Sequence, residues 1–136
     1  MIRVLFLDDD ATRYKFLEGN RLLLKNIPEF EFVWVSNMKD FEEKLMSEDF
    51  DVVSLDHDLE IFEENEYGRR HEITGMDASK KLIGILGVAT KQKIIIHSWN
   101  SVGARNMQKY FKDKNLFAPW IPYATGALYE AYGEQV

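Results

Sequence analysis

The chain of 136 residues contains no cysteine and only three prolines. Without cysteine the protein has no disulfide framework, no thiol nucleophile and no cysteine-ligated metal site. No apolar stretch approaches the roughly 20 residues that a membrane-spanning helix needs. The N-terminus also lacks the basic, apolar and small-residue order of a secretory signal. We therefore expect a cytoplasmic protein that does not bind membranes.

Positive charge is also scarce, because 17 Lys and Arg residues stand against 23 Asp and Glu residues, for a formal net charge of −6. Such a surface disfavours non-specific binding to duplex DNA, which depends on a basic surface. A phosphorylated substrate stays compatible, because a bound cation can reverse the local potential. With 46% hydrophobic and 29% charged residues, the composition is that of a globular protein, and the length predicts a single domain over residues 1–136.

Apolar segments of strand length alternate with segments of helical periodicity along the chain. We expect strands over residues 2–7, 30–35, 52–55, 93–96 and about 117–121. Because Pro119 and Pro122 interrupt the last of these, it should lie at a sheet edge. The intervening segments predict helices over about 11–25, from 38, over 75–86, from 101 and over about 127–132. This alternation predicts βαβ units, a mainly parallel sheet and an α/β fold.

Polar residues at the expected helix starts support these boundaries. Asp10 can cap the first helix and Asn37 the second, and Thr74 with Asp77 forms a capping box. Either Asn100 or Ser101 can cap the fourth helix. Residues 60–73 break the pattern as an unusually long polar connection. This loop is either a lid or substrate-contact loop beside the site, or a solvated insertion.

Two acidic clusters follow expected strands: Asp8-Asp9-Asp10 after residues 2–7, and Asp56-His57-Asp58 after residues 52–55. The carboxyl ends of parallel strands meet at one edge of the sheet, where ligands of such folds bind. Carboxylates brought together repel one another unless a cation is present, and oxygen ligands suit a hard divalent cation. We expect Mg²⁺ or Mn²⁺ to be held by Asp8, Asp9, Asp56 and Asp58.

These segments resemble the receiver domain of two-component signalling. The resemblance implies that the acidic pair and Asp56 hold Mg²⁺, that Asp56 accepts a phosphoryl group, and that Ser98 is the family's hydroxyl residue. The chain departs from receivers in one important respect. Receivers pair the phosphoryl group with a lysine at the end of the fifth strand, and residues 117–122 contain no lysine.

The chain is more similar to the cyclic-phosphate-processing receiver domains found among phages and bacterial RNA-repair or conflict systems. The matching segments are residues 7–9 with Arg13, residues 55–59, residues 74–77 and residues 97–103. The resemblance implies a three-layer, flavodoxin-like sandwich with five strands in the order 2-1-3-4-5. It also implies a cyclic phosphate as the substrate and, for a phage protein, the host cytoplasm as the compartment.

His57 and His97 fit such chemistry, because a histidine can take or give a proton near neutral pH. Opening a cyclic phosphodiester needs a deprotonated water and a protonated leaving alkoxide. The two histidines could divide these tasks beside Asp56, one could instead bind the metal, or each could be a core histidine. For substrate binding we select Arg13, Ser98 and Asn100 for the phosphate and Trp99 for stacking on a base.

Three functions remain open from the sequence. The first is a metal-dependent phosphoesterase that acts on a 2′,3′-cyclic phosphate at an RNA end or on a cyclic nucleotide. The second is a degenerate receiver that takes a phosphoryl group onto Asp56 for signalling. The third is a protein that binds and sequesters a phosphorylated ligand, or a host or phage protein partner, without turnover.

Overall fold

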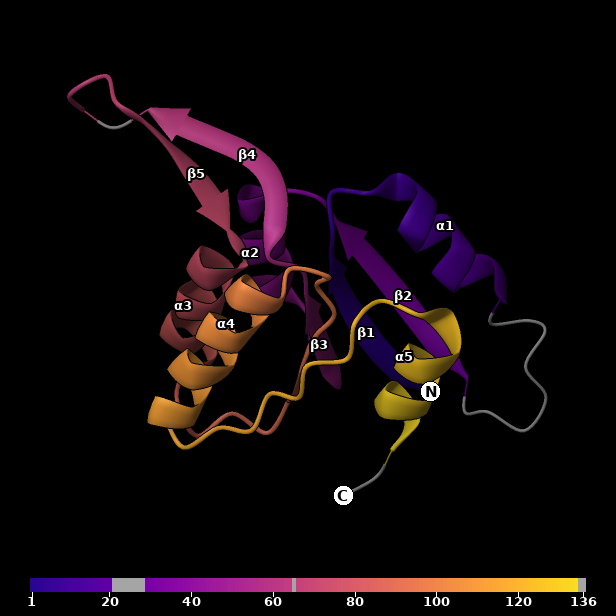
Figure 1. The fold of residues 1–136 in the computed structure, drawn as a ribbon. Coiled ribbons are helices and arrows are strands. Elements are labelled where there is room, and N and C mark those ends of the chain that lie inside the picture. The colour runs from indigo at the N-terminus through magenta and orange to yellow at the C-terminus, as the bar shows by residue number, and fades with distance from the viewer. Residues whose placement is uncertain (21–28, 65, 135–136) are drawn as a thin grey trace.

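Four parallel strands form the centre of the protein in the computed structural model, which describes residues 1–20, 29–64 and 66–134. Figure 1 shows this sheet. Its strands are β1 (Ile2–Leu7), β2 (Phe30–Val35), β3 (Val52–Leu55) and β6 (Lys93–Ile96). They lie in the order β2-β1-β3-β6, and every neighbouring pair is parallel. The expected α/β fold and the first four places of the strand order are confirmed.

Helices cover both faces of the sheet, which gives three layers (Figure 1). One face carries α2 (Met38–Ser47), α3 (Gly75–Leu86) and α4 (Ser101–Asp113), and the other carries α1 (Ala11–Asn20) and α5 (Thr125–Gly133). The expected extension of the first helix toward residue 25 lies outside the described residues. Among the described helices, none combines the length and the apolar character needed to cross a membrane.

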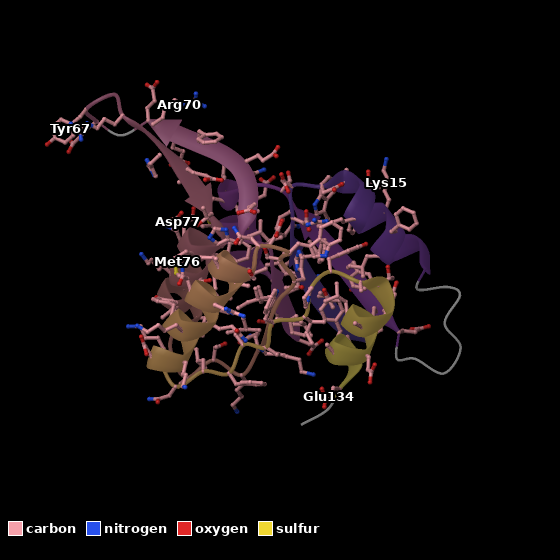
Figure 2. The ribbon with its side chains drawn as sticks, viewed as in Figure 1. Lys15, Tyr67, Arg70, Met76, Asp77 and Glu134 are labelled. Atoms are coloured by element: carbon pink, nitrogen blue, oxygen red, sulfur yellow. The ribbon has the colours of Figure 1, made fainter. Side chains whose placement is uncertain are left out.

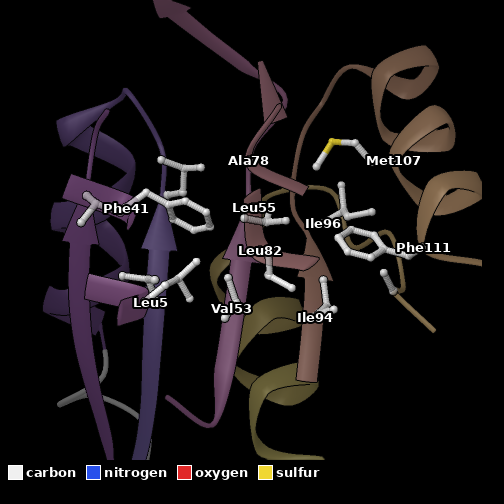
Figure 3. Packing of buried hydrophobic residues seen from close by; sticks show 14 of the residues in the cluster. Leu5, Phe41, Val53, Leu55, Ala78, Leu82, Ile94, Ile96, Met107 and Phe111 are labelled. Carbon is white, nitrogen blue, oxygen red and sulfur yellow. The ribbon is translucent and has the colours of Figure 1, made fainter. Parts of the chain in front are cut away.

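Alternating side chains of the strands build a core on each face of the sheet. Leu5 and Leu7 of β1 pack with α2, α3 and α4, whereas Val4 and Phe6 pack with α1 and α5. Figure 3 shows the first of these cores, with strand residues against Phe41 of α2 and other helix side chains. The strands are therefore buried on both faces, and polar side chains are concentrated beyond their ends.

The expected helix caps are present. The Asp10 carboxylate accepts the Thr12 N–H at 2.8 Å, and Asn37 accepts the Asp40 N–H. Thr74 and Asp77 form the reciprocal capping box of α3. Of the two candidates for α4, the cap is Asn100, whose side chain accepts the Gly103 N–H at 2.9 Å.

The prediction of a fifth strand is wrong. Residues 117–121 lie beside β6, but Trp120 forms only an isolated parallel bridge to Ile96. Ile96 N–H donates to Pro119 O and Ile121 N–H donates to Ile96 O, but Pro119 has no N–H with which to extend this pairing into a strand. The fifth place in the expected order is therefore occupied by an irregular edge segment.

The prediction of a long loop at residues 60–73 is also wrong. An antiparallel hairpin stands there, made of β4 (Asp58–Glu64) and β5 (Arg70–Thr74). Its base is anchored because Leu59 and Ile73 are buried. Figures 1 and 2 show the hairpin projecting from the body, with Tyr67 and Arg70 at its far end.

Candidate metal and phosphate site

The register of the sheet brings three polar residues together at its carboxyl edge. Leu7 pairs with Leu55, and Leu55 pairs with Ile96, so the next residue of each strand is Asp8, Asp56 or His97. The hydrogen-bond ladder continues into them, since Asp56 N–H donates to Leu7 O and His97 N–H donates to Leu55 O. All three are buried, with exposed fractions of 0%, 3% and 0%. This depth is unusual for carboxylates.

Asp8 is held by several donors at once. One carboxylate oxygen accepts the Asp10 N–H at 2.8 Å, and the other lies 3.0 Å from His97 Nε2 and 3.3 Å from an Arg13 guanidinium nitrogen. Burial by itself would raise the pKa of Asp8, but the interactions with His97, the Asp10 N–H and Arg13 together outweigh it and the pKa is lowered. Asp8 is therefore an ionised, fixed carboxylate.

A buried chain of hydrogen bonds supports His97 from below. His97 Nδ1 lies 2.8 Å from Ser54 Oγ, which lies 2.7 Å from the Tyr132 hydroxyl of α5. Burial lowers the pKa of His97 and raises that of Tyr132, so the imidazole is neutral and the phenol keeps its proton. Because ionised Asp8 can only accept, Nε2 carries the imidazole proton, Ser54 donates to Nδ1 and Tyr132 donates to Ser54. Every donor in this series of hydrogen bonds, from Tyr132 to Asp8, therefore has an acceptor.

The pKa of Asp56 is shifted in the opposite direction to that of Asp8. Burial and the nearby charge of Asp8 raise its pKa from 3.8 to about 7, against the opposing effects of Arg13 and the His57 N–H. Half-buried Asp9 adds to the repulsion, and burial together with the Asp8 charge raises its own pKa. The three carboxyl groups cannot all ionise at low cost without a cation.

An open cleft of about 430 Å³ leads to these carboxylates. Its wall combines acidic side chains with one arginine and the start of α4: Asp9, Asp10, Ala11, Arg13, Asp56, Asp58, Glu60, Ser98, Trp99 and Asn100. Seven of the ten residues predicted to form the site are among them. His57 and His97, the two predicted proton carriers, do not line this cleft. Asp8 lies beneath it, fully buried.

Arg13 lies between the carboxylates and two aromatic rings. One guanidinium nitrogen is 3.3 Å from Asp8 and 3.5 Å from Asp56. The guanidinium carbon lies 4.4 Å from the Trp99 ring centroid and 5.5 Å from that of Tyr123. The Trp99 indole donates to Tyr123 O at 3.0 Å, which fixes the ring although it is 63% exposed. Both Arg13 and Trp99 therefore face the cleft in defined positions.

His57 belongs to a second hydrogen-bonded group at the side of the cleft. Its Nδ1 lies 2.6 Å from Asp58, and the Asn100 amide donates to the same carboxylate at 3.1 Å. Burial would raise the pKa of Asp58, but these two hydrogen bonds and the nearby charge of Arg13 together outweigh it and the pKa is lowered. A Cβ at Gly103 would lie 2.4 Å from the His57 ring, so only glycine lets α4 approach this closely. Asn100 thus serves both as helix cap and as a support for Asp58.

The residues present can accommodate a hard cation. One ligand atom from each of Asp8, Asp56 and His97 lies within 4.8 Å of the others. His97 Nε2 is already engaged by Asp8, so the two carboxylates are the oxygen donors that this group offers. Of the four expected metal ligands, Asp8 and Asp56 belong to this group, and Asp9 and Asp58 line the cleft outside it.

Three further residues contribute to the site without having been predicted. Ser54 and Tyr132 complete the chain to His97, and a lone serine inside a strand of aliphatic residues was the available signal for Ser54. Glu60 reaches the cleft from a hairpin bulge at a φ of 51°. No sequence pattern indicates that bulge.

The fold and the site together define a receiver-type domain. Similar solved structures include a CheY-like receiver domain from Methanospirillum hungatei JF-1, at 15% identity and a TM-score of 0.67, covering 96% of this chain and 90% of that one. The receiver domain of sensor histidine kinase PA1611 from Pseudomonas aeruginosa PAO1, with a magnesium ion in its active-site cleft, has 13% identity and a TM-score of 0.67, covering 96% and 93%. A response regulator from Burkholderia pseudomallei, with a phosphorylated aspartic acid, a calcium ion and citrate, has 13% identity and a TM-score of 0.67. This chain covers 66% of its length, and the match takes in 97% of this chain.

A family model described as the cyclic-phosphate processing receiver domain matches residues 3–113. The chain belongs to this family, as its sequence motifs had indicated. No curated protein matches it.

Proposed function

We propose that the protein is a metal-dependent phosphoesterase that opens a cyclic phosphate, either a 2′,3′-cyclic RNA end or a cyclic nucleotide. The observation that carries this proposal is the pair of buried carboxylates, Asp8 and Asp56, at the floor of an open cleft. Burial, together with their mutual repulsion, raises the pKa of Asp56 to about 7. Two buried carboxylates this close together suit a bound cation, which would neutralise their charge. The family description names cyclic phosphate, which supplies the proposed substrate class.

Asp8 and Asp56 would hold the metal, and Asp9 and Asp58 add negative charge to the wall of the same cleft. Carboxylate ligands favour Mg²⁺, and Mn²⁺ fits the same donors. When bound, the cation supplies charge neutralisation at the phosphate and a more acidic water. The hydrogen bonds to Asp8 keep that carboxylate ionised and oriented before the metal arrives.

Opening the ring adds one water across one P–O bond. The water oxygen bonds to phosphorus, one ring oxygen leaves as an alcohol, and the proton of the water has to reach that oxygen. Ser98 lines the cleft, and its Oγ accepts the Asn100 N–H at 3.0 Å, which leaves its own proton to donate to a phosphate oxygen. Trp99 offers an exposed ring beside it for a base.

The two histidines take different roles in this proposal. His97 is fully buried with both ring nitrogens hydrogen-bonded, so it acts as a positioning residue for Asp8. His57 is partly exposed and paired with Asp58, an arrangement that orients an imidazole for proton transfer at the cleft edge. Of the two, His57 is the better candidate for protonating the leaving oxygen.

A ³¹P NMR time course with Mn²⁺ tests the proposal. The substrates are 2′,3′-cyclic nucleotides, 3′,5′-cyclic nucleotides and cyclic oligonucleotides, each incubated with wild type and with Asp56→Asn. We expect one class of cyclic resonance to disappear and a monoester resonance to appear with wild type only. A panel that stays intact with both proteins, at Mn²⁺ concentrations that saturate the site, refutes the phosphoesterase.

The position of Asp56 also supports a second function, that of a phospho-accepting receiver. Asp56 directly follows β3 and lines the cleft, and the similar Burkholderia pseudomallei response regulator carries a phosphorylated aspartic acid. Intact-mass analysis after treatment with acetyl phosphate and Mg²⁺ distinguishes the two. A stable adduct of one phosphoryl group on wild type, absent from Asp56→Asn, would support signalling. Tight ligand binding with neither adduct nor product would support sequestration.

A further inference from the structure

We infer that Arg13 is a built-in cation of the metal-free site, and that it leaves Asp8 and Asp56 to bind the substrate phosphate when the metal enters. The inference rests on the proposed function, because it assumes the divalent cation and the phosphate. It assigns to Arg13 two alternative sets of partners. It also makes metal binding and phosphate binding depend on each other.

The position of one guanidinium nitrogen carries the first half of the inference. That nitrogen lies 3.3 Å from Asp8 Oδ2 and 3.5 Å from Asp56 Oδ2. The same two carboxylates belong to the group that could hold a metal ion. A divalent cation held by these two carboxylates would compete with the guanidinium for them, because both carry positive charge.

The composition of the cleft wall carries the second half. Among the described residues that line the cleft, Arg13 is the one basic side chain, and four of the others are aspartates. A phosphate entering this cleft therefore has Arg13 as its positively charged protein partner. A guanidinium displaced from two carboxylates is available for this role, and its planar donors match phosphate oxygens.

The surroundings of Arg13 allow such a movement. Its guanidinium packs on Trp99 and Tyr123, and the Tyr123 hydroxyl donates to the Arg13 carbonyl. The side chain lines the open cleft, where its Nε lies 3.9 Å from Asp10. The side chain is 18% exposed. A change in the Arg13 rotamer moves the guanidinium along the two aromatic rings, away from the carboxylates and toward the phosphate. Helix α1 does not have to move for this exchange.

Two consequences can be measured. Since Arg13 competes with the metal, removing its charge should strengthen metal binding. Since the metal releases Arg13, the metal should strengthen phosphate binding, and phosphate should strengthen metal binding by the same factor. Part of this coupling comes from direct contact between metal and phosphate, and the part that Arg13 contributes should vanish with its side chain.

Isothermal titration of Mn²⁺, with and without inorganic phosphate, tests both consequences. The proteins are wild type, Arg13→Gln, Arg13→Lys and a matched control, Lys15→Gln, which removes one positive charge from the same helix. Figure 2 shows the Lys15 side chain projecting outward from α1. We expect Arg13→Gln to bind Mn²⁺ alone about tenfold more tightly than wild type, a typical size for such coupling. Phosphate should then enhance Mn²⁺ binding several-fold less than it does in wild type, whereas Lys15→Gln should behave as wild type in both titrations.

Arg13→Lys separates charge from packing, because it keeps the charge and should leave the affinity for Mn²⁺ alone within a few-fold of wild type. Equal Mn²⁺ affinity in wild type and Arg13→Gln would overturn the inference. A measurement on wild type alone guards against an unstable variant. The Arg13 side-chain Nε–H signal in a ¹⁵N NMR spectrum should shift when Mg²⁺ is added and shift again with phosphate, and an unmoved signal would also overturn the inference.

The outcomes keep the inference and the proposed function apart. Coupling through Arg13 without cleavage of any cyclic phosphate would keep the inference and remove the phosphoesterase. Cleavage with Mn²⁺ affinities that do not depend on Arg13 would keep the phosphoesterase and remove the inference. No Mn²⁺ binding by any of the four proteins would remove both.

Discussion

Replacing Asp56 with asparagine should stabilise the metal-free protein, and the gain should grow with pH. Asparagine keeps the shape of the side chain and removes a charge that is buried beside Asp8. The pKa of Asp56 rises from 3.8 to about 7 in the native state, so the native protein keeps this proton to a higher pH than the unfolded chain does. Stability linked to Asp56 is therefore greatest at low pH, is lost as the pH rises from about 4 to about 7, and stays constant above that.

The size of the effect follows from that shift. One pKa unit corresponds to about 1.36 kcal/mol, so the full penalty of ionised Asp56 approaches about 4 kcal/mol above pH 7. Between pH 5 and pH 8, wild type should lose roughly 2 to 3 kcal/mol more unfolding free energy than Asp56→Asn loses. The pKa of about 7 already includes the favourable charge of Arg13, so losing that contact in the variant needs no separate correction.

Urea denaturation followed by circular dichroism, in buffers with a chelator at pH 5, 6, 7 and 8, measures this difference. Asp49→Asn is the matched control, because it makes the same chemical change at an exposed position. It should track wild type at every pH. Parallel stability curves for wild type and Asp56→Asn would refute the electrostatic account of the site. Saturating Mg²⁺ should restore wild type at pH 8 and leave Asp56→Asn unchanged.

Four other predictions test separate parts of the site. Mn²⁺ affinity, measured by titration calorimetry, should rise between pH 6 and pH 8, because the metal has to displace the Asp56 proton. Ser54→Ala should lower the unfolding free energy by about 1 to 3 kcal/mol, since it leaves a buried imidazole nitrogen without its partner, and it should also weaken Mn²⁺ binding. Gly103→Ala should displace the His57 ring, so turnover should fall while Mn²⁺ affinity stays near wild type. Trp99→Ala should raise the KM for a cyclic nucleotide with little change in kcat, as steady-state assays would show.

The convergence of the acidic clusters could be predicted from the sequence because it depends on topology alone. Continuous apolar segments of strand length predict buried, parallel strands. The residues that follow such strands lie together at the carboxyl edge of the sheet. Asp8 and Asp56 accordingly lie side by side. The helix caps were equally accessible, because capping depends on residues that are close together in the sequence.

The hairpin and the edge segment show where such reasoning fails. The residues of β4 and β5 are rich in charge, so their sequence predicts a loop, either a lid or substrate-contact loop or a solvated insertion, yet Leu59 and Ile73 anchor them to the core. A two-stranded ribbon that is exposed over most of its length gives only a weak alternation. Residues 117–121 have the composition of a strand, but beside Pro119 they form only a single bridge, between Trp120 and Ile96.

The roles of the two histidines depended on burial, which residue spacing does not report. Both follow strands and stand beside acidic or hydroxyl residues in the sequence. His97 nevertheless lies beneath the cleft, stacked on Phe6 at 4.4 Å, and its partner Ser54 is 43 positions away. His57 lies against Gly103 at the side. Only the three-dimensional arrangement separates a positioning residue from a candidate proton donor.

The central claim is that this site adds water to a cyclic phosphate with the help of a metal held by Asp8 and Asp56. Mass spectrometry of the product formed in ¹⁸O-labelled water tests it most directly. We predict one ¹⁸O atom in the new phosphomonoester, formed by wild type with Mn²⁺ and not formed by Asp56→Asn or in the presence of a chelator. Absence of labelled product from wild type, or equal labelling by Asp56→Asn, would contradict the claim.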